Sequence, residues 1–123
     1  MKNNSTGMAH FFKAFGYSIE GLKWIWARET AFRHDVYFCV FCLAVAFVAA
    51  GFNPLSVGAV VFSCAFLLVA EVLNSAVECV VDIVSPEFDK YAKAAKDMGS
   101  FAVFIAVVNL SWQTLAALFA AIS

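Results

Sequence analysis

Five polar residues share one face of a helix that is otherwise apolar. They recur at short steps between positions 71 and 82: Glu71, Asn74, Ser75, Glu78 and Asp82. At about 100° per residue, all of them fall within about 60° of Glu71, so they form a single polar stripe. An ionised carboxylate in hydrocarbon costs several kcal/mol unless it is paired, hydrated or bound to a metal. This polar stripe is therefore a candidate functional site.

The side chains of the polar stripe and of the segments around it could carry out phosphoryl chemistry. Carboxylate and amide oxygens are the hard ligands that Mg²⁺ accepts, a lysine supplies a point charge for phosphate, and a glutamate can act as a general base. The residues of these types are Glu29, Glu71, Asn74, Glu78, Asp82, Lys96 and Asp97. Together they suit transfer of a phosphoryl group from a magnesium nucleotide to a lipid hydroxyl. The sequence contains no Walker-type GxxxxGK[ST], no kinase Gly-rich loop and no His-rich metal motif.

The composition indicates an integral membrane protein. Of the 123 residues, 63% are hydrophobic and 14% are charged, and the mean hydropathy is +0.84. A soluble domain of this size would have too little polar surface to cover itself. The cysteines all lie within apolar runs and have no metal-type pairing to histidine: Cys39, Cys42, Cys64 and Cys79. We interpret them as reduced, small hydrophobic residues.

Four helical segments are expected to position the polar residues. The region 8–34 is predicted to be an amphipathic helix in the membrane–water interface, because its apolar residues recur at three- and four-residue steps. Three apolar runs predict membrane-spanning helices over 36–52, 55–84 and 98–122. Gly16 and Gly21 interrupt the surface helix, and Ser85-Pro86 ends the second span. The expected fold class is all-α, with a single membrane domain over 1–123.

The basic residues predict the orientation of the three spans. All eight Lys and Arg lie in two segments, one before the first span and one between the second and third spans: Lys2, Lys13, Lys23, Arg28, Arg33, Lys90, Lys93 and Lys96. The positive-inside rule places both segments in the cytoplasm. The polar stripe is then expected at the cytoplasmic end of the second span, beside the surface helix and the charged residues 87–97, which could form a loop or a short helical extension.

Three stretches of sequence carry a resemblance to a known family. Glu71-Val-Leu-Asn-Ser-Ala-Val-Glu-Cys-Val-Val-Asp82 is followed by Ala95-Lys-Asp-Met-Gly-Ser100. The surface-helix region contributes Lys13-Ala-Phe-Gly-Tyr-Ser18, Gly21-Leu22 and Glu29-Thr-Ala-Phe-Arg33. From about Asn3 to Val108 the chain resembles the prokaryotic diacylglycerol kinase family.

The resemblance implies a homotrimer of three-span subunits in the bacterial inner membrane. Such an enzyme phosphorylates diacylglycerol with Mg-ATP and yields phosphatidic acid, and it has no nucleic-acid partner. Its active sites are shared between neighbouring subunits at the cytoplasmic surface, on the same side as the N-terminus. The cofactor it implies is Mg²⁺, and ATP is the phosphoryl donor.

The resemblance also implies roles for individual residues. Glu71 would be the general base, Asn74 would orient Glu71 or the phosphoryl group, and Glu29 and Glu78 would hold the divalent ions. The nucleotide-binding residues would be His10, Tyr17, Glu29, Glu78, Glu87, Asp89, Lys96 and Asp97, and the lipid-binding residues would be His10, Glu71 and Ser100. The chain departs from the family at two points: Gram-negative members usually carry Arg in place of His10, and Gly-Ser in place of Ser85-Pro86.

Other readings of the same residues remain open at this level. The acceptor could be undecaprenol, with the same chemistry, or the protein could be a small proton-coupled transporter in which Glu71 carries the proton. Glu29 and Arg33 could form a plain surface ion pair one helical turn apart. Asn109 and Gln113 are expected to be hydrogen-bonding contacts between helices. His34 and Asp35 are expected to mark the interface where the first span begins.

Overall fold

A computed structural model describes residues 6–123, and this part of the chain is folded into helices joined by short turns. The elements are α1 (Gly7–Arg28), α2 (Thr30–Ala50), α3 (Pro54–Val84) and α4 (Lys90–Ile122). Three of them, α2, α3 and α4, are long and apolar enough to cross a membrane. The all-α fold class with three candidate spans is therefore confirmed. Lys2, one of the basic residues used to predict orientation, lies outside the described residues.

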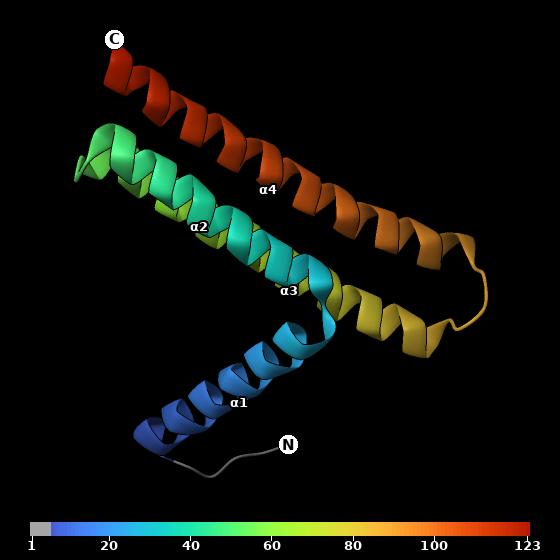
Figure 1. The fold of residues 1–123 in the computed structure, drawn as a ribbon. Helices are drawn as coiled ribbons and strands as arrows, with labels where there is room; N and C mark the ends of the chain where they lie inside the picture. The colour runs from blue at the N-terminus through green and yellow to red at the C-terminus, as the bar shows by residue number, and fades with distance from the viewer. Residues whose placement is uncertain (1–5) are drawn as a thin grey trace.

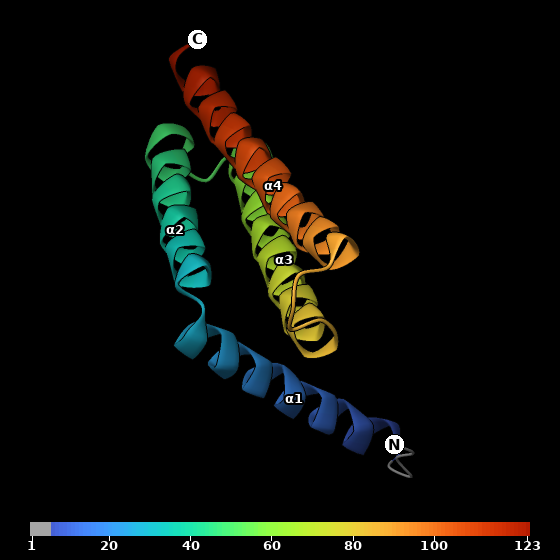
Figure 2. The same cartoon turned by 90° about the vertical axis from the view of Figure 1, so that its right-hand side faces the viewer.

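The three long helices run alongside one another, and α1 leaves the start of α2 at a steep angle (Figures 1 and 2). The α2–α3 turn and the C-terminus lie at one end of this bundle. The α3–α4 turn and the junction with α1 lie toward the other end, which we call the polar end because the polar stripe is located there. The fold thus brings α1, the end of α3 and the start of α4 to the same side of the protein.

The first span begins earlier than its sequence pattern predicts, because the chain bends at Glu29. Glu29 has extended backbone angles (φ −108°, ψ 103°), so α1 ends at Arg28 and α2 begins at Thr30, not at position 36. The guanidinium of Arg33 donates hydrogen bonds to the Trp26 carbonyl oxygen and, at 3.1 Å, to Thr30 Oγ1. Arg33 therefore ties the two helices together across the bend and, among residues 6–123, does not form an ion pair with Glu29.

The turns between the spans follow from local sequence. After α2, Gly51 takes a positive φ of 62°, a conformation that a residue with a side chain adopts only with strain. Asn53 then caps α3 by accepting hydrogen bonds from the backbone N–H groups of Leu55 (3.0 Å) and Ser56 (3.3 Å). Pro54 occupies the first turn of α3, where its missing N–H is not needed.

The sequence left open whether residues 87–97 form a loop or a helical extension, and they form both, a turn followed by the start of α4. A short turn follows the end of α3, and Asp89 caps α4 by accepting hydrogen bonds from Tyr91 N (2.8 Å) and Ala92 N (3.1 Å). Residues from Lys90 onward are helical, so α4 extends the third apolar run at its N-terminal end. By contrast, Gly16 and Gly21 do not interrupt α1, which is one continuous helix.

Most of the side chains buried in the interior of the bundle are small, either alanine or cysteine. The buried apolar cluster consists of Cys39, Cys42 and Ala46 on α2, Val60, Cys64 and Leu67 on α3, and Ala106, Leu110 and Ala117 on α4. Small residues let helix backbones approach closely, which is the usual basis of helix association in membranes. Large apolar side chains cover the outside, as in a lipid-facing surface; Phe62, for example, is 73% exposed.

One hydrogen bond between side chains joins α3 and α4 in the apolar region. Asn109 Nδ2 donates to Ser63 Oγ over 3.0 Å, and Ser63 is 2% exposed. The sequence prediction that Asn109 connects helices is therefore confirmed. Gln113 forms no such bond among residues 6–123.

Removing the Asn109 side chain should weaken the bundle without changing its fold. We expect Asn109→Ala to lower the free energy of unfolding by about 1 kcal/mol, the usual scale of a hydrogen bond between membrane helices. Gln113→Ala is the matched control and should leave stability almost unchanged. Thermal unfolding in detergent micelles measures both variants, and equal stability of the two would contradict this interpretation.

Candidate functional site

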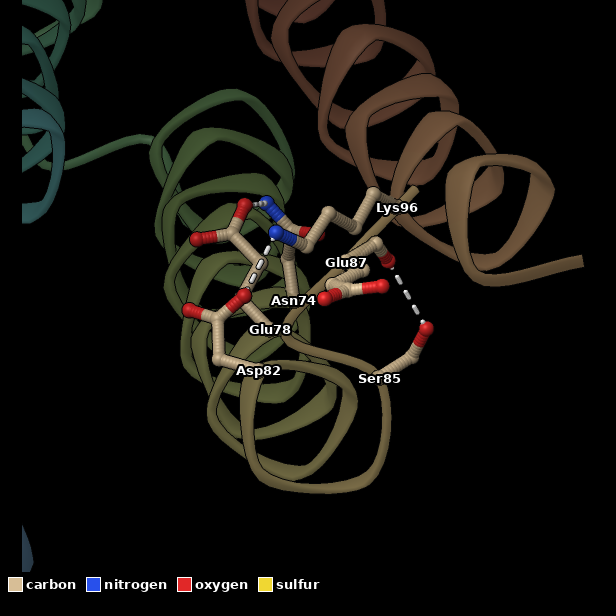
Figure 3. A network of polar contacts seen from close by, with 6 residues as sticks. All are labelled: Asn74, Glu78, Asp82, Ser85, Glu87 and Lys96. Carbon is tan, nitrogen blue, oxygen red and sulfur yellow. Dashed lines mark hydrogen bonds and ion pairs between the residues drawn. The ribbon is translucent and has the colours of Figure 1, made fainter. Parts of the chain in front are cut away.

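The polar stripe of α3 divides between two neighbouring helices. Glu71 and Ser75 are each only 6% exposed, Asn74 and Glu78 are half-buried, and Asp82 is exposed. Asn74, Glu78 and Asp82 face the start of α4 (Figure 3). Glu71 lies against Asp35 of α2. Residues that share one face in the sequence pattern therefore take part in two different sets of contacts.

On the α4 side, two polar contacts follow one another toward the end of α3. Asn74 Nδ2 donates a hydrogen bond to Glu78 Oε1 over 3.2 Å. One turn further, Lys96 Nζ reaches from α4 to Asp82 Oδ1 over 2.6 Å (Figure 3). Both partners of this ion pair are exposed, so it contributes little to stability and mainly sets the position of the Lys96 ammonium.

A polar cavity of about 310 Å³ lies between the end of α3, the following turn and the first turns of α4. Its polar lining residues are Asp82, Ser85, Glu87, Asp89, Lys93, Lys96 and Asp97. The fold thus brings together four of the residues expected to bind a nucleotide, Glu87, Asp89, Lys96 and Asp97. Lys93, which the sequence analysis used only to predict orientation, also lines this cavity and forms an ion pair with Asp97 over 2.7 Å.

On the α2 side, Glu71 has a neighbour that the sequence analysis missed. The carboxyl groups of Asp35 and Glu71 lie within hydrogen-bonding reach of each other. Asp35 Oδ2 is closed off from solvent and has no donor among residues 6–123. Two carboxyl groups can share a hydrogen bond only when one of them holds a proton. The two acids lie against each other at the interface of α2 and α3.

From the sequence, Asp35 is expected to mark the interface where the first span begins, but Asp35 lies inside that helix. Because α2 begins at Thr30, Asp35 lies more than one turn inside that helix. The sequence did carry a signal: Asp35 is in helical register with Cys39, Cys42 and Ala46, the residues that α2 buries. An acid on the buried face of a span indicates a partner across the helix interface.

The residues expected on α1 and around the bend lie apart from this cluster. His10 and Tyr17 are exposed on α1, Ser100 is exposed on α4, and Glu29 lies half-buried at the α1–α2 bend. Among residues 6–123, no group of three or more His, Cys, Asp or Glu side chains is arranged to hold a metal ion. Within one chain, a magnesium site using Glu78 would need ligands from phosphate, water or another subunit.

The chain matches the family model described as prokaryotic diacylglycerol kinase over residues 16–119. The chain belongs to the prokaryotic diacylglycerol kinase family. The family prediction is therefore confirmed, and as a member the chain is an ATP-dependent lipid kinase with transmembrane helices.

Relatives from several bacteria align with most of this family member. It is 36% identical to the diacylglycerol kinase of Escherichia coli strain K12 over 108 residues, which is 88% of each chain. It is 39% identical to the diacylglycerol kinase of Helicobacter pylori strain 26695 over 109 residues, covering 86% of this chain and 84% of the relative. The Pseudomonas aeruginosa PAO1 diacylglycerol kinase is 39% identical over 115 residues, covering 89% and 90%.

Replacing Asp35 with asparagine should stabilise this family member. The amide supplies an N–H donor to the Glu71 carboxylate and removes one of two adjacent acids, so we expect the free energy of unfolding to rise by about 1 kcal/mol at neutral pH. The same change at Asp82, which is paired with Lys96, is the control and should not stabilise. Thermal unfolding in micelles measures both variants, and a loss of stability in Asp35→Asn would contradict the close, unfavourable approach of the two acids.

Proposed function

We propose that this protein phosphorylates diacylglycerol with Mg-ATP at the cytoplasmic surface of the bacterial inner membrane, yielding phosphatidic acid. The observation that carries this proposal is the arrangement at the polar end of α3. A buried residue, Glu71, lies about one turn from Asn74, which is hydrogen-bonded to Glu78, and about three turns from the polar cavity that Lys96 lines. Along α3, these groups run from the apolar part of the bundle toward the cavity proposed for the nucleotide.

Glu71 is proposed to be the general base. It takes the proton from the lipid hydroxyl while the hydroxyl oxygen attacks the γ-phosphorus of ATP, and ADP leaves with the electrons of the broken P–O bond. The position of Glu71 suits a substrate that stays in the membrane, because Glu71 is only 6% exposed and lies on a candidate span. Such a reaction needs positioning and charge neutralisation but no covalent enzyme intermediate.

Glu78 and Glu29 are proposed to hold Mg²⁺ together with the ATP phosphates. Glu78 fits this role because its hydrogen-bond partner is a neutral amide, so its negative charge is not offset by that contact. Mg²⁺ binds oxygen ligands and usually completes its coordination with phosphate and water. When bound, it would neutralise negative charge on the β- and γ-phosphates. Asn74 is proposed to orient Glu71, which lies within its hydrogen-bonding reach, or the phosphoryl group, and it also holds the Glu78 carboxylate.

The polar cavity is proposed to take the nucleotide phosphates. Lys96 supplies positive charge there and is held by Asp82, while Glu87, Asp89 and Asp97 complete its polar wall. His10 and Tyr17 on α1, together with Ser100, are proposed to contact nucleotide or lipid. Because all three are exposed and none lines the cavity of its own chain, they could meet the site of a neighbouring subunit.

The whole chain is proposed to act as one membrane domain, assembled as a homotrimer with composite active sites. Supporting this is the incompleteness of the site in one chain: Glu29 lies at the α1–α2 bend, and no metal-type cluster forms among residues 6–123. The positive-inside rule supports a cytoplasmic N-terminus and polar end, because all Lys and Arg belong to the segments there.

Glu71→Gln should abolish phosphorylation while leaving the protein folded. The amide keeps the size and hydrogen bonding of the side chain but cannot accept the hydroxyl proton, so we expect a loss of at least about 10²-fold in kcat. The assay uses purified protein in micelles, Mg-ATP and either diacylglycerol or undecaprenol, with thermal unfolding as the folding control. Activity on undecaprenol alone would move the acceptor to that lipid, and full activity of the variant would refute the role of Glu71.

Mixed oligomers test whether the sites are shared between subunits. If Glu29 and Glu71 of one site come from different chains, co-expressing Glu29→Gln with Glu71→Gln should restore roughly a quarter of wild-type activity, the share of sites that receive both intact residues on random mixing. Co-expressing Glu71→Gln with Glu78→Gln is the control, because α3 carries both residues and no intact α3 is present. Equal, negligible activity of both mixtures would contradict composite sites.

A further inference from the structure

Gly99 on α4 lies directly against the amide of Asn74 on α3. A Cβ atom placed at Gly99 would overlap Asn74 Oδ1 and come within 3.0 Å of Asn74 Cγ. At the other glycines, Gly7, Gly16, Gly21, Gly51 and Gly58, a Cβ atom would meet no other side chain or distant backbone within 4 Å among residues 6–123. Among the glycines of residues 6–123, Gly99 is therefore the one whose lack of a side chain leaves room for a contact between two helices.

The amide of Asn74 has a fixed orientation. Only its nitrogen can donate to the Glu78 carboxylate, and it does so over 3.2 Å. The oxygen must then point the other way, toward Gly99. That oxygen is closed off from solvent and accepts no hydrogen bond from residues 6–123. The amide is held between a carboxylate on one side and the bare backbone of α4 on the other.

We propose that Gly99 is a positioning residue for phosphoryl transfer, because it leaves the space in which the Asn74 amide holds the Glu78 carboxylate in place. This inference rests on the proposed function, in which Glu78 is a metal ligand and Asn74 holds its carboxylate. It adds a residue from a second helix, one that touches neither substrate nor metal. Gly99 acts through Asn74, and Asn74 acts through Glu78.

A methyl group at position 99 would displace the amide without displacing the helices. The atom that clashes is the end of a side chain, and Asn74 and Gly99 both border an apolar cavity of about 520 Å³ between α3 and α4. The amide therefore has room to turn away. Once turned, its nitrogen no longer reaches Glu78, and the carboxylate loses the contact that fixes it.

The test is Gly99→Ala, with Gly58→Ala as the matched control. Gly58 is also in the interior of a membrane-spanning helix but faces open space, so the same substitution there should keep activity and metal dependence close to wild type. We expect Gly99→Ala to keep the wild-type oligomer and unfolding temperature. We expect its kcat to fall about 10-fold or more and its half-saturating Mg²⁺ concentration to rise, as when groups that orient metal ligands are removed.

A second variant separates an effect on the amide from general damage. In an Asn74→Ala background there is no amide to displace, so adding Gly99→Ala should cause no further loss. Mn²⁺ binding in the presence of a non-hydrolysable ATP analogue, followed by electron paramagnetic resonance, gives this comparison without requiring turnover. If Gly99→Ala alone fails to fold, the double variant should fold, because the clashing atoms are gone.

The outcomes distinguish this inference from the function on which it rests. Full activity and unchanged Mg²⁺ dependence of Gly99→Ala, while Asn74→Ala is inactive, would overturn the role of Gly99 alone. Losses that add in the double variant, or a double variant that does not fold, would overturn it as well. Full activity of Asn74→Ala would instead overturn the proposed role of Asn74, and with it the inference.

Discussion

The constraint on which the rest of the structure depends is that α3 carries acids and an amide into an apolar bundle. Each of these groups needs a partner where water is scarce, because an unpaired buried polar group is costly. Two neighbouring helices contact these groups: Asp35 of α2 lies against Glu71, and Lys96 of α4 pairs with Asp82 at the exposed end. Asn74 and Glu78 satisfy each other in part, on the same helix. The polar contacts of α3 thus join it to both neighbouring helices at the polar end of the bundle, while the apolar cluster packs the rest.

α4 can approach α3 closely because several of the residues that face α3 have a small side chain or none. Ala95, Gly99 and Ala102 are among the residues that face α3 along the cavity, and Ala106 further along is fully buried. Small side chains at helical spacing allow two backbones to come close, and the Asn109–Ser63 hydrogen bond fixes their register. The apolar half of the bundle therefore acts as a rigid support for the polar half. A site that must hold Glu78 in a set direction benefits from such support.

The bend at Glu29 separates the membrane-spanning part of the chain from α1. α1 leaves the bundle at a steep angle (Figure 1), and none of its residues lines the polar cavity of the same chain. Trp26, next to the bend, packs edge-to-face against Phe32 and Tyr37 of α2, so the angle between the helices has a structural basis. A lipid kinase of this family works where a membrane-bound acceptor meets a water-soluble donor. A helix directed away from the spans at that boundary can serve a site beyond its own chain.

The sequence by itself determined the features that depend on local patterns. Apolar runs, the breaks at Gly51–Pro54 and Ser85-Pro86, and the spacing of Glu71, Asn74, Glu78 and Asp82 all act through neighbours along the chain, so the helices and the polar stripe were predictable. The bend at Glu29 was not, because no Gly or Pro lies there and the contacts of Arg33 that bridge the bend arise only when both helices are formed. Only the tertiary structure decided that Glu71 meets Asp35, that Lys93 joins the polar cavity, and that Gly99 receives the Asn74 amide. Helical periodicity states which residues share a face, but packing between helices decides what that face meets.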